Sequence, residues 1–412
     1  MSKQSGTRAE QTKAARARTS GVRRGNTLKV LEALRKDGPT SQAALARSVE
    51  LSPATVNNIV KALRDEGAVE LQPLNGRESL VALVPTQGAV VSIQVNVTSL
   101  HGALFDFGRG DRYDAEVTFE EDSEAEGGNP EIALEMIHKL AAIAGLEVRD
   151  LAGVAVGMQA PIARPSGKIA SWARLQLPSW QDIVIEEALA GELGVPVVVE
   201  NDANLAALAE WTWGAGRGMD DFLYVACGSR IGGGFVINGK IYYGGDGMAG
   251  EIGHMMLEPN GPVCFCGSRG CLTTVTSERS ILSALRASGG TQRNLAEVIE
   301  AAKEGDPACQ RVLYETGRHL GRALASTAKV MAPSMIVIGG LLGRSGSLVF
   351  KSLLSSAEVN SLKAVSPSIR FRAAEVNADA TLLGGVAAVL EHTGQGASDL
   401  SAWMQAAQPF RK

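Results

Sequence analysis

A chain of 412 residues exceeds what a single hydrophobic core usually holds, so we expect two or three domains. Hydrophobic content of 45% and charged content of 20% are ordinary for a soluble globular protein. An N-terminal apolar segment and an apolar run of about eighteen residues are both missing, which argues against a signal peptide or a membrane span. With few cysteines as well, we expect a cytoplasmic protein without a membrane partner.

Charge is distributed unevenly along the chain. Residues 1–85 carry 14 Lys/Arg and 8 Asp/Glu, a net charge of +6, whereas residues 86–412 carry 26 and 36, a net charge of −10. A basic N-terminal module on an acidic body indicates that one end of the protein meets a polyanion. Residues 1–22 are polar, basic and poor in large apolar groups, so we expect a disordered basic tail there.

Residues 23–86 follow the pattern of a winged helix-turn-helix domain. Three short amphipathic helices are followed by two strands. The third helix begins at Pro53, a position that needs no amide donor, and Ser52 can cap it. The two strands flank a turn that carries Arg77 and would form the wing. A three-helix protein-interaction module is the alternative, and the basic charge favours DNA.

The polar face of the third helix is predicted to read DNA. Short amides and a hydroxyl near a helix N-terminus can reach base edges in the major groove, and basic side chains suit phosphates or the minor groove. We expect base contacts from Ala54, Thr55, Asn57 and Asn58, and contacts to phosphate or the minor groove from Lys61 and Arg77.

Beyond the linker, alternating strands and helices predict an α/β body with helices on the faces of a central sheet. Strands are predicted at 90–97, 102–107, 151–158, 195–200, 222–226, 234–238, 335–340 and 369–373, and helices at 130–144, 182–193, 294–303, 307–331 and 380–392. We assign 87–202 to a first lobe, completed by 376–393, and 203–375 to a second lobe with a dimer surface on its long helices. Residues 394–412 form a tail.

One histidine and three cysteines lie close together in the second lobe: His254, Cys264, Cys266 and Cys271. Imidazole and thiolate are the ligands that zinc favours, and four protein ligands leave no position open for water, so a structural zinc site is predicted. Gly267 and Gly270 would allow the positive φ that a tight knuckle needs. Unrelated buried thiols are the alternative.

The motif Glu-Ile-Gly-His at 251–254, followed by Cys-x-Cys-Gly-x-x-Gly-Cys at 264–271, resembles the ROK family, which groups bacterial sugar kinases with sugar-responsive repressors. The runs 227–240 and 200–204 resemble that family too, and the resemblance covers about residues 86–393. It implies a two-lobed actin-like, hexokinase-like ATPase fold with a zinc knuckle. The N-terminal domain resembles the DNA-binding end that ROK repressors carry and ROK kinases lack.

The resemblance also implies a sugar site. Asp202 stands where the family places its catalytic base, and Asn201, Glu251 and His254 match the sugar-contacting residues. Thr273 stands where the family usually has a glutamate, so this position keeps one hydrogen bond and loses a carboxylate. Asp202 as a plain N-cap of a helix over 203–210 is the alternative, and both roles are compatible.

The phosphate-binding motifs have diverged. Where family kinases carry Asp-x-Gly-Gly-Thr, this chain reads Gln-Val-Asn-Val-Thr at 94–98, and the usual Gly-Thr-Gly reads Gly-Ser-Arg at 228–230. Gln159-Ala160 replaces a Pro-Gly pair, and only Gly339-Gly340 is retained. Losing a metal-binding carboxylate and close backbone approach removes much of the electrostatic stabilisation of phosphoryl transfer. We therefore expect no ATP cofactor and no kinase activity, with Asp202 a relic of the base.

These features together predict a homodimer or dimer of dimers that binds a double-stranded DNA operator and represses sugar uptake or catabolism genes. A sugar or sugar-phosphate effector would alter lobe closure and the spacing of the two reading heads. Arg174 and Arg230 are candidates for an anionic group of that effector. Two alternatives remain: a sugar kinase with a fused DNA-binding domain, and a regulator controlled by a protein partner with a relic pocket.

Overall fold

The computed structural model describes residues 26–27, 29–30, 33–34, 38–65, 69–75, 78–83, 88–119, 128–362, 369–376 and 379–393. The predicted tails 1–22 and 394–412, the residues Leu28 and Leu31 of the first predicted amphipathic helix and the predicted wing residue Arg77 lie outside this range. The chain forms two compact units, one of residues 1–89, 105–112 and 390–412 and the other of residues 90–104 and 113–389.

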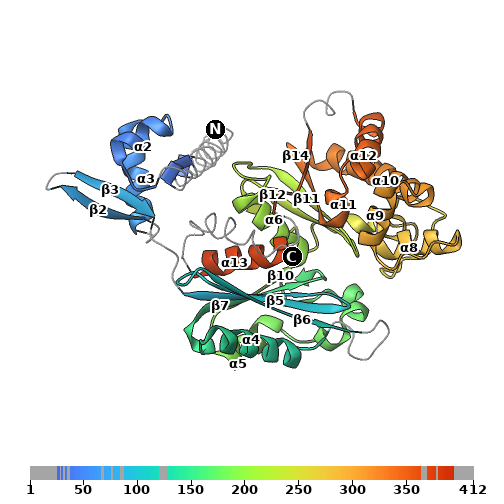
Figure 1. Cartoon of the computed structure of the whole chain (residues 1–412), viewed down its shortest axis with the longest axis horizontal. Coiled ribbons are helices and arrows are strands. Elements are labelled where there is room, and N and C mark those ends of the chain that lie inside the picture. Colours follow the sequence, from blue (N-terminus) through green and yellow to red (C-terminus); the bar gives the residue numbers. More distant parts are fainter. Residues whose placement is uncertain are drawn as a thin grey trace, which may run out of the picture. The chain divides into compact units, whose positions relative to one another are not determined.

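The N-terminal unit contains helices followed by a small antiparallel sheet (Figure 1). Its elements are β1 (Thr40–Ser41), α2 (Gln42–Ser48), α3 (Pro53–Asp65), β2 (Val69–Asn75) and β3 (Glu78–Leu83), with the sheet in the order β1-β3-β2. Residues 26–27, 29–30 and 33–34 are also helical. The buried core is made by Val30, Leu34, Leu45, Val49, Val56, Ile59, Val60, Leu63, Val69 and Val81.

Serine caps fix the starts of α2 and α3. Ser41 Oγ accepts from the amide of Ala44 at 3.2 Å before α2. Ser52 Oγ accepts from the amide of Thr55 at 3.1 Å, with Pro53 at the first helical position of α3. Each cap satisfies an amide that has no partner within its helix, so the two helices are held at a defined turn.

A five-stranded sheet in the order β10-β7-β4-β5-β6 forms the first lobe of the body (Figure 1). Its strands are β4 (Ala89–Val95), β5 (Ser99–Asp106), β6 (Asp111–Thr118), β7 (Leu151–Met158) and β10 (Val197–Asn201), and its helices are α4 (Pro130–Ala144), α5 (Ile185–Leu193) and α13 (Ala380–His392). β7 and β10 are parallel, so their carboxyl ends meet at one edge of the sheet. Asn201 lies at that edge.

Close backbone approach seats the helices of this lobe on its sheet. A Cβ at Gly102 would meet Met136 of α4 at 2.6 Å, and one at Gly385 would meet Ser92 of β4 at 2.2 Å. α4 and α13 therefore pack tightly on the sheet, and Figure 1 shows them on opposite faces. α5 begins at Ile185, three residues later than the predicted helix, because Asp182 has a φ of 63°, outside the helical region.

A second five-stranded sheet, in the order β13-β12-β11-β14-β15, forms the other lobe. Its strands are β11 (Phe222–Cys227), β12 (Ile231–Ile237), β13 (Lys240–Ile241), β14 (Met335–Gly339) and β15 (Arg370–Ala373). α6 (Asp202–Trp213) follows β10 of the first sheet and packs on β12, where a Cβ at Gly234 would meet the carbonyl oxygen of Ala203 at 2.6 Å. One helix thus contacts strands of both lobes.

Helices cover the second sheet (Figure 1). They are α7 (Thr273–Thr276), α8 (Glu278–Ala287), α9 (Leu295–Glu304), α10 (Pro307–Met331), α11 (Gly340–Arg344) and α12 (Ser347–Asn360). The long helices α10 and α12 lie in intimate contact, because a Cβ at Gly321 of α10 would fall 2.3 Å from the carbonyl oxygen of Leu353. Of the helices described, none is long and apolar enough to span a membrane.

Short elements complete the body. They are η1 (Val148–Asp150), β8 (Ile162–Ala163), β9 (Lys168–Ile169), η2 (Ser171–Gln176), η3 (Pro178–Trp180) and η4 (Ile252–His254). η2 and η4 matter most for the site, because η2 carries aromatic and amide side chains and η4 ends at His254.

Candidate functional site: a thiol and imidazole cluster beside a carboxyl pair

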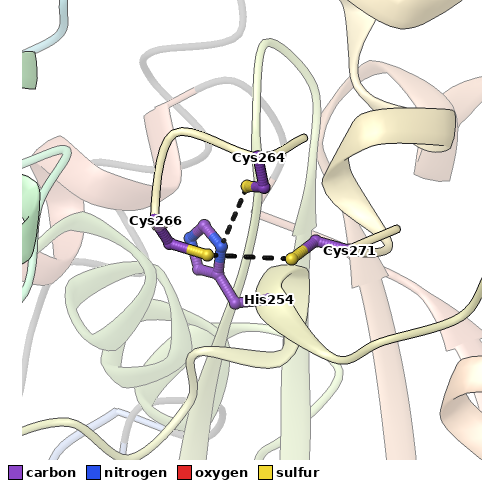
Figure 2. A group of neighbouring side chains, drawn as sticks. All are labelled: His254, Cys264, Cys266 and Cys271. Carbon is purple, nitrogen blue, oxygen red and sulfur yellow. Dashed lines mark hydrogen bonds between the residues drawn. The ribbon is translucent and has the colours of Figure 1, made fainter. Parts of the chain in front are cut away.

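The predicted metal ligands are brought together. The ligand atoms of His254, Cys264, Cys266 and Cys271 all lie within 4.8 Å of one another. Figure 2 shows the four side chains pointing toward a common centre, with Cys264 Sγ 3.5 Å from His254 Nδ1 and Cys266 Sγ 3.7 Å from Cys271 Sγ. All five cysteines of the chain are free thiols.

These distances fit a metal of zinc's size. A tetrahedral zinc with ordinary bond lengths has sulfur–sulfur edges of about 3.8 Å and nitrogen–sulfur edges of about 3.6 Å. The two measured edges, 3.7 Å and 3.5 Å, match those values. Burial and the neighbouring thiols raise the pKa of Cys271 to about 12, because three sulfurs share a small, poorly solvated space. A cation there would favour the thiolate forms, so the cluster can hold a metal ion.

Glycines allow the knuckle that collects these ligands. Gly267 and Gly270 have φ values of 87° and 65°, as the predicted fold-back requires. At Gly270 a Cβ would also overlap the carbonyl oxygen of Glu258, at 1.6 Å. Any other residue at 270 would therefore displace the segment that returns Cys271 to the cluster.

The second ring nitrogen of His254 faces the neighbouring carboxyl group. His254 Nε2 lies 3.9 Å from Glu251 Oε2, while Nδ1 faces the thiols. Burial lowers the pKa of His254, and the charge of Arg230 adds to this shift. The imidazole is thus held neutral, as a metal ligand must be, and can present an N–H on the side of Glu251.

Asp202 and Glu251 form a carboxyl pair. Burial raises the pKa of Asp202 to about 6, against the opposing effects of the Ala203 amide and of Arg230. Burial, together with the charge of Asp202, raises the pKa of Glu251 to about 7, and Arg230 again opposes the shift. Two poorly solvated carboxyl groups beside a cation can accept or donate hydrogen bonds to hydroxyl groups of a ligand.

The N-cap of α6 is Asn201, which corrects the alternative reading of Asp202 as the cap. Asn201 Oδ1 accepts from the amides of Ala203 and Asn204 at 3.0 and 3.2 Å, and its Nδ2 donates to the carbonyl oxygen of Ala160 at 3.2 Å. Asp202 is the first helical residue, and its Oδ1 accepts from the Ala203 amide at 2.8 Å. The carboxyl group of Asp202 is therefore not needed to start the helix.

Sequence reasoning missed the group that supports this end of β10. Buried Glu200 accepts from the Asn201 amide at 2.7 Å and from Asn204 Nδ2 at 3.1 Å, and it pairs with Arg164. Arg164 in turn lies 3.5 Å above the ring of Tyr243. The motif at 200–204 was visible in the sequence, but the arginine partner is 36 residues away and gave no local signal.

Aromatic rings beside His254 were also missed. Trp172 of η2 meets the His254 ring edge-on at 4.9 Å and stacks with Phe265 at 6.2 Å, and Phe265 lies 5.0 Å from His254. Arg230 lies over the other aromatic partner, with its guanidinium carbon 4.9 Å from the centre of the Phe265 ring. The imidazole is thereby packed between the first lobe and the knuckle.

Other predicted residues are placed less centrally. Thr273 is buried at the start of α7, directly after the cluster, and its carbonyl oxygen accepts from Ser280 Oγ at 3.2 Å. Arg230, predicted as a contact for an anionic group of the effector, lies where its charge acts on Asp202 and Glu251. The side chain of Arg174 lies outside the described part of the chain.

The turn between β4 and β5 is closed by its own side chains. Gln94 Nε2 donates to Asn96 Oδ1 at 3.0 Å, and Asn96 Nδ2 donates to Ser99 Oγ at 3.2 Å. By the resemblance, Gln94 stands for a metal-binding carboxylate and Asn96 for a glycine. The polar groups of this turn are thus engaged with one another, in a segment that carries phosphate contacts in family kinases.

The predicted DNA-reading face of α3 is available to solvent. Ala54, Asn57, Asn58 and Lys61 are exposed, opposite the buried stripe of this helix. Thr55 is half-buried, and its hydroxyl lies 2.8 Å from Ser52 Oγ at the cap. A helix with a buried apolar stripe and an exposed face of short amides is suited to enter a major groove.

A winged helix-turn-helix domain joined to a two-lobed, hexokinase-like body defines the class of protein. The chain belongs to the ROK family: the model described as "ROK family" matches residues 90–392, and the model described as "Winged helix-turn-helix DNA-binding" matches residues 23–70. These matches confirm the predicted resemblance and fold class.

Similar sequences include proteins named as transcriptional regulators and proteins named as kinases. The chain is 26% identical to a "Xylose repressor" of Caldicellulosiruptor bescii over 89% of this chain and 95% of that protein. It is 26% identical to the "DNA-binding transcriptional dual regulator NagC" of Escherichia coli over 83% of this chain and 87% of that protein. A "Glucokinase" of Halalkalibacterium halodurans is 34% identical but matches only 57% of this chain, and 75% of that enzyme.

Solved structures agree on the fold. A ROK family transcriptional regulator, described as a homolog of the E. coli MLC protein, superposes with a TM-score of 0.70 at 22% identity, covering 93% of this chain and all of that one. A ROK glucokinase of Streptomyces griseus superposes with a TM-score of 0.62 at 26% identity, covering 72% of this chain and 98% of that one. The regulator covers a larger share of this chain than the kinase does.

The raised pKa of Asp202 predicts a pH-dependent gain of stability in Asp202→Asn. The folded state binds the proton more tightly than the unfolded state, so stability falls as pH rises from about 4 through about 6 and stays lower above it. Asp202→Asn removes this cost and should stabilise the protein by about 1 kcal/mol at about pH 8, an amount already reduced for solvent screening. The gain should vanish near pH 4.

Melting temperatures measured by calorimetry across this range check the prediction. Asp306→Ala is the control of opposite sign, because Asp306 caps α10 through the Cys309 amide at 2.7 Å and its pKa is lowered. That variant should lose stability at neutral pH and recover toward low pH. A gain for Asp202→Asn that is independent of pH would contradict the assigned burial of the carboxylate.

Proposed function

We propose that this protein is a DNA-binding transcriptional repressor controlled by a sugar or a sugar derivative. The single observation that carries the proposal is the union, in one chain, of a helix-turn-helix domain with an exposed amide-rich α3 and a ROK body. A relative named as a xylose repressor aligns with both parts, over 89% of this chain. Genes of sugar uptake or catabolism are the proposed targets.

DNA is proposed to meet the exposed face of α3. Asn57, Asn58, Ala54 and Thr55 lie within the first two turns, where a helix entering the major groove presents its side chains to base edges. Lys61 follows one turn after Asn57 and suits a phosphate contact, which adds affinity without sequence preference. Arg77 of the wing is proposed to contact phosphate or the minor groove.

The effector is proposed to bind between Asp202 and the knuckle. Asp202, Glu251 and His254 offer two carboxyl groups and a ring N–H to sugar hydroxyls, and Asn201 and Thr273 complete the set. Because Asp202 begins α6 and Glu251 precedes η4, a sugar held by both would join two separate segments of the body. A ligand that favours one arrangement of these segments shifts the equilibrium between conformations.

We propose that the body does not use nucleotide and has no kinase activity. Gln94 and Asn96 replace a metal-binding carboxylate and a glycine of the family motif, and both amides are engaged within the turn. Phosphoryl transfer depends on a metal ion and on backbone groups that approach the phosphates closely. A sugar kinase with a fused DNA-binding domain is the second candidate, since Asp202, with a pKa of about 6, could still act as a general base.

The metal of the cluster is proposed to be structural zinc. Three thiolates and an imidazole are a common zinc ligand set, and all four positions are filled by the protein, which excludes a role in activating water. Zinc bound there would hold the knuckle and orient the free N–H of His254. Thiolate ligands of this kind persist in a reducing compartment, so a cytoplasmic location is proposed as well.

Dimerisation is proposed through α10 and α12. These helices carry large apolar side chains that are exposed in the single chain: Tyr314, Val330, Leu354 and Val359. Helix-turn-helix proteins read two half-sites as dimers, so two copies of the reading head would be set at a fixed spacing. Closure of each body around an effector would then change that spacing.

Zinc binding makes a direct prediction for cysteine variants. Purified protein should contain about one zinc per chain, and Cys266→Ser should lose most of it and unfold at a lower temperature, because metal-binding free energy adds to folding free energy. Elemental analysis and thermal unfolding measure both effects. Cys309→Ala is the matched control, since Cys309 lies on α10 outside the cluster and its loss should leave the zinc content unchanged. Full zinc content in Cys266→Ser would contradict the site.

DNA recognition can be tested with two variants of α3. On a duplex selected from a random pool, Asn58→Ala should lose about 1–3 kcal/mol of specific binding with little change on unrelated DNA. Lys61→Ala should weaken binding to every duplex and reduce the salt dependence by about one counterion. Fluorescence anisotropy at several salt concentrations measures both.

Lys139→Ala, an exposed lysine on α4, is the matched control and should behave as wild type. A panel of pentoses, hexoses and their phosphates added to the wild-type complex should contain at least one compound that lowers DNA affinity. Failure of the wild type to bind any duplex at physiological salt would overturn the proposed function.

A further inference from the structure

The turn between β11 and β12, residues 228–230, reaches across to the first lobe at two consecutive side chains. Ser229 Oγ accepts from Gln159 Nε2 at 2.9 Å, and Arg230 donates to Gln176 Oε1. Both glutamines belong to the first lobe: Gln159 directly follows β7, and Gln176 ends η2. The partners are 70 and 54 residues apart in sequence, so each bond joins distant parts of the chain.

Gln159 binds a second turn at the same time. Its Oε1 accepts from the amide of Val97 at 3.3 Å, in the turn between β4 and β5. The backbone N–H of Gln159 donates to the carbonyl oxygen of Val95 at 2.9 Å. This bond fixes the backbone from which the side chain of Gln159 extends. One amide group therefore joins the end of β7, the β4–β5 turn and the β11–β12 turn.

These two turns are the ones that diverge from the phosphate-binding motifs of the family. The resemblance implies that, in kinases of the family, both turns contact the phosphates of the nucleotide. Here protein side chains make the connection: an amide bridges Val97 and Ser229, and a guanidinium reaches Gln176. Hydrogen bonds to the uncharged amides of Gln159 and Gln176 replace contacts with an anionic ligand, and no metal ion is needed to balance them.

The second contact extends to the proposed effector site. Arg230 lies over the Phe265 ring of the knuckle, and its charge opposes the rise that burial causes in the pKa of both Asp202 and Glu251. A residue that contacts the first lobe through Gln176 is thus also the counter-charge of the carboxyl pair. Movement between the lobes would change the electrostatic environment of the site where the effector is proposed to bind.

We propose that Gln159, Ser229 and Arg230 are positioning residues that form a bridge between the lobes, in place of nucleotide phosphates. The bridge holds the former phosphate side together without nucleotide, so that occupancy of the sugar site alone sets the arrangement of the lobes. The proposal rests on the proposed function, in that it requires a body that no longer uses nucleotide. Gln159 is the central member, because its one amide contacts both turns.

Hydrogen exchange of the full-length protein, without DNA, sugar or nucleotide, tests the bridge. Gln159→Ala removes both bonds of the amide and should speed exchange in peptides covering 94–99 and 226–231 by about five-fold, the order expected for one lost hydrogen bond. Ser229→Ala should speed exchange in 226–231, whereas Ser229→Thr keeps the hydroxyl and should restore protection. Peptides from β10 and α4 should be unchanged in all three variants, which separates loss of the bridge from general destabilisation.

A double-mutant cycle makes the test specific. If Gln159 and Ser229 act through their shared bond, the double variant should exchange in 226–231 no faster than the faster of the two single variants. Ser166→Ala is the matched control, because its exposed hydroxyl contacts Ala163 within the first lobe, at 3.3 Å, and its loss should leave both peptides unchanged. Should Gln159→Ala unfold the whole protein, the comparison of Ser229→Ala with Ser229→Thr carries the test.

Additive effects of the two substitutions, or exchange in 226–231 that Ser229→Ala does not change, would overturn the bridge. Adding the non-hydrolysable nucleotide AMPPNP with magnesium gives a second criterion: wild-type exchange in both peptides should stay the same. If the nucleotide slows hydrogen exchange in either peptide, the proposal that the bridge takes the place of nucleotide phosphates is wrong. The exchange experiment contains no DNA. If the protein failed to bind any duplex, the proposed function would be wrong, but the exchange results would still decide whether the bridge exists.

Discussion

The arrangement of the site depends on the imidazole of His254, which lies between the cysteine cluster and Glu251. Its Nδ1 lies 3.5 Å from a thiol of the cysteine cluster, and its Nε2 lies 3.9 Å from Glu251. A metal bound by the thiols would fix the ring, and the ring would then fix the direction of the N–H that faces the ligand site. A metal held in the knuckle would thus act on the proposed effector site through the side chain of His254.

The knuckle is also tied to the long helix α10. Arg322 donates to the carbonyl oxygen of Leu257 at 2.7 Å and to Glu258 Oε1 at 2.6 Å, and Thr327 Oγ1 lies 3.3 Å from Met255 Sδ. The segment that follows His254 is therefore held by a helix that packs against α12, the proposed dimer surface. Contacts of this kind connect the proposed effector site physically to the proposed dimer surface.

Much of the fold could be predicted because local signals agree with tertiary structure. α4 was expected at 130–144, where Asn129 caps the start and Gly145 ends the helix with a φ of 70°. α12 was missed: its serine-rich sequence is a weak helix signal, and close packing against Gly317 and Gly321 of α10 supports it instead. β6 was missed because an edge strand with mostly exposed side chains shows little hydrophobic pattern.

The site, like the fold, could be predicted from the sequence only in part. The four metal ligands lie within 18 residues of one another and share a chemistry, so their spacing was enough to predict the cluster that the structure shows. Arg164 with Glu200, Trp172 with His254 and Gln159 with Ser229 are pairs separated by 36 to 82 residues, and only the folded chain brings them together. The assignment of Asp202, Glu251 and His254 to an effector, and of the exposed face of α3 to DNA, stays a prediction.

We propose that a body of kinase fold has given up nucleotide chemistry and serves a DNA-binding domain. A coupled ADP-release assay, with zinc-replete protein, magnesium ATP and a panel of pentoses and hexoses, tests it most directly. The account predicts no turnover above the protein-free background with any sugar. Sugar-dependent ADP release that is abolished in Asp202→Asn would contradict it and would identify the protein as a sugar kinase.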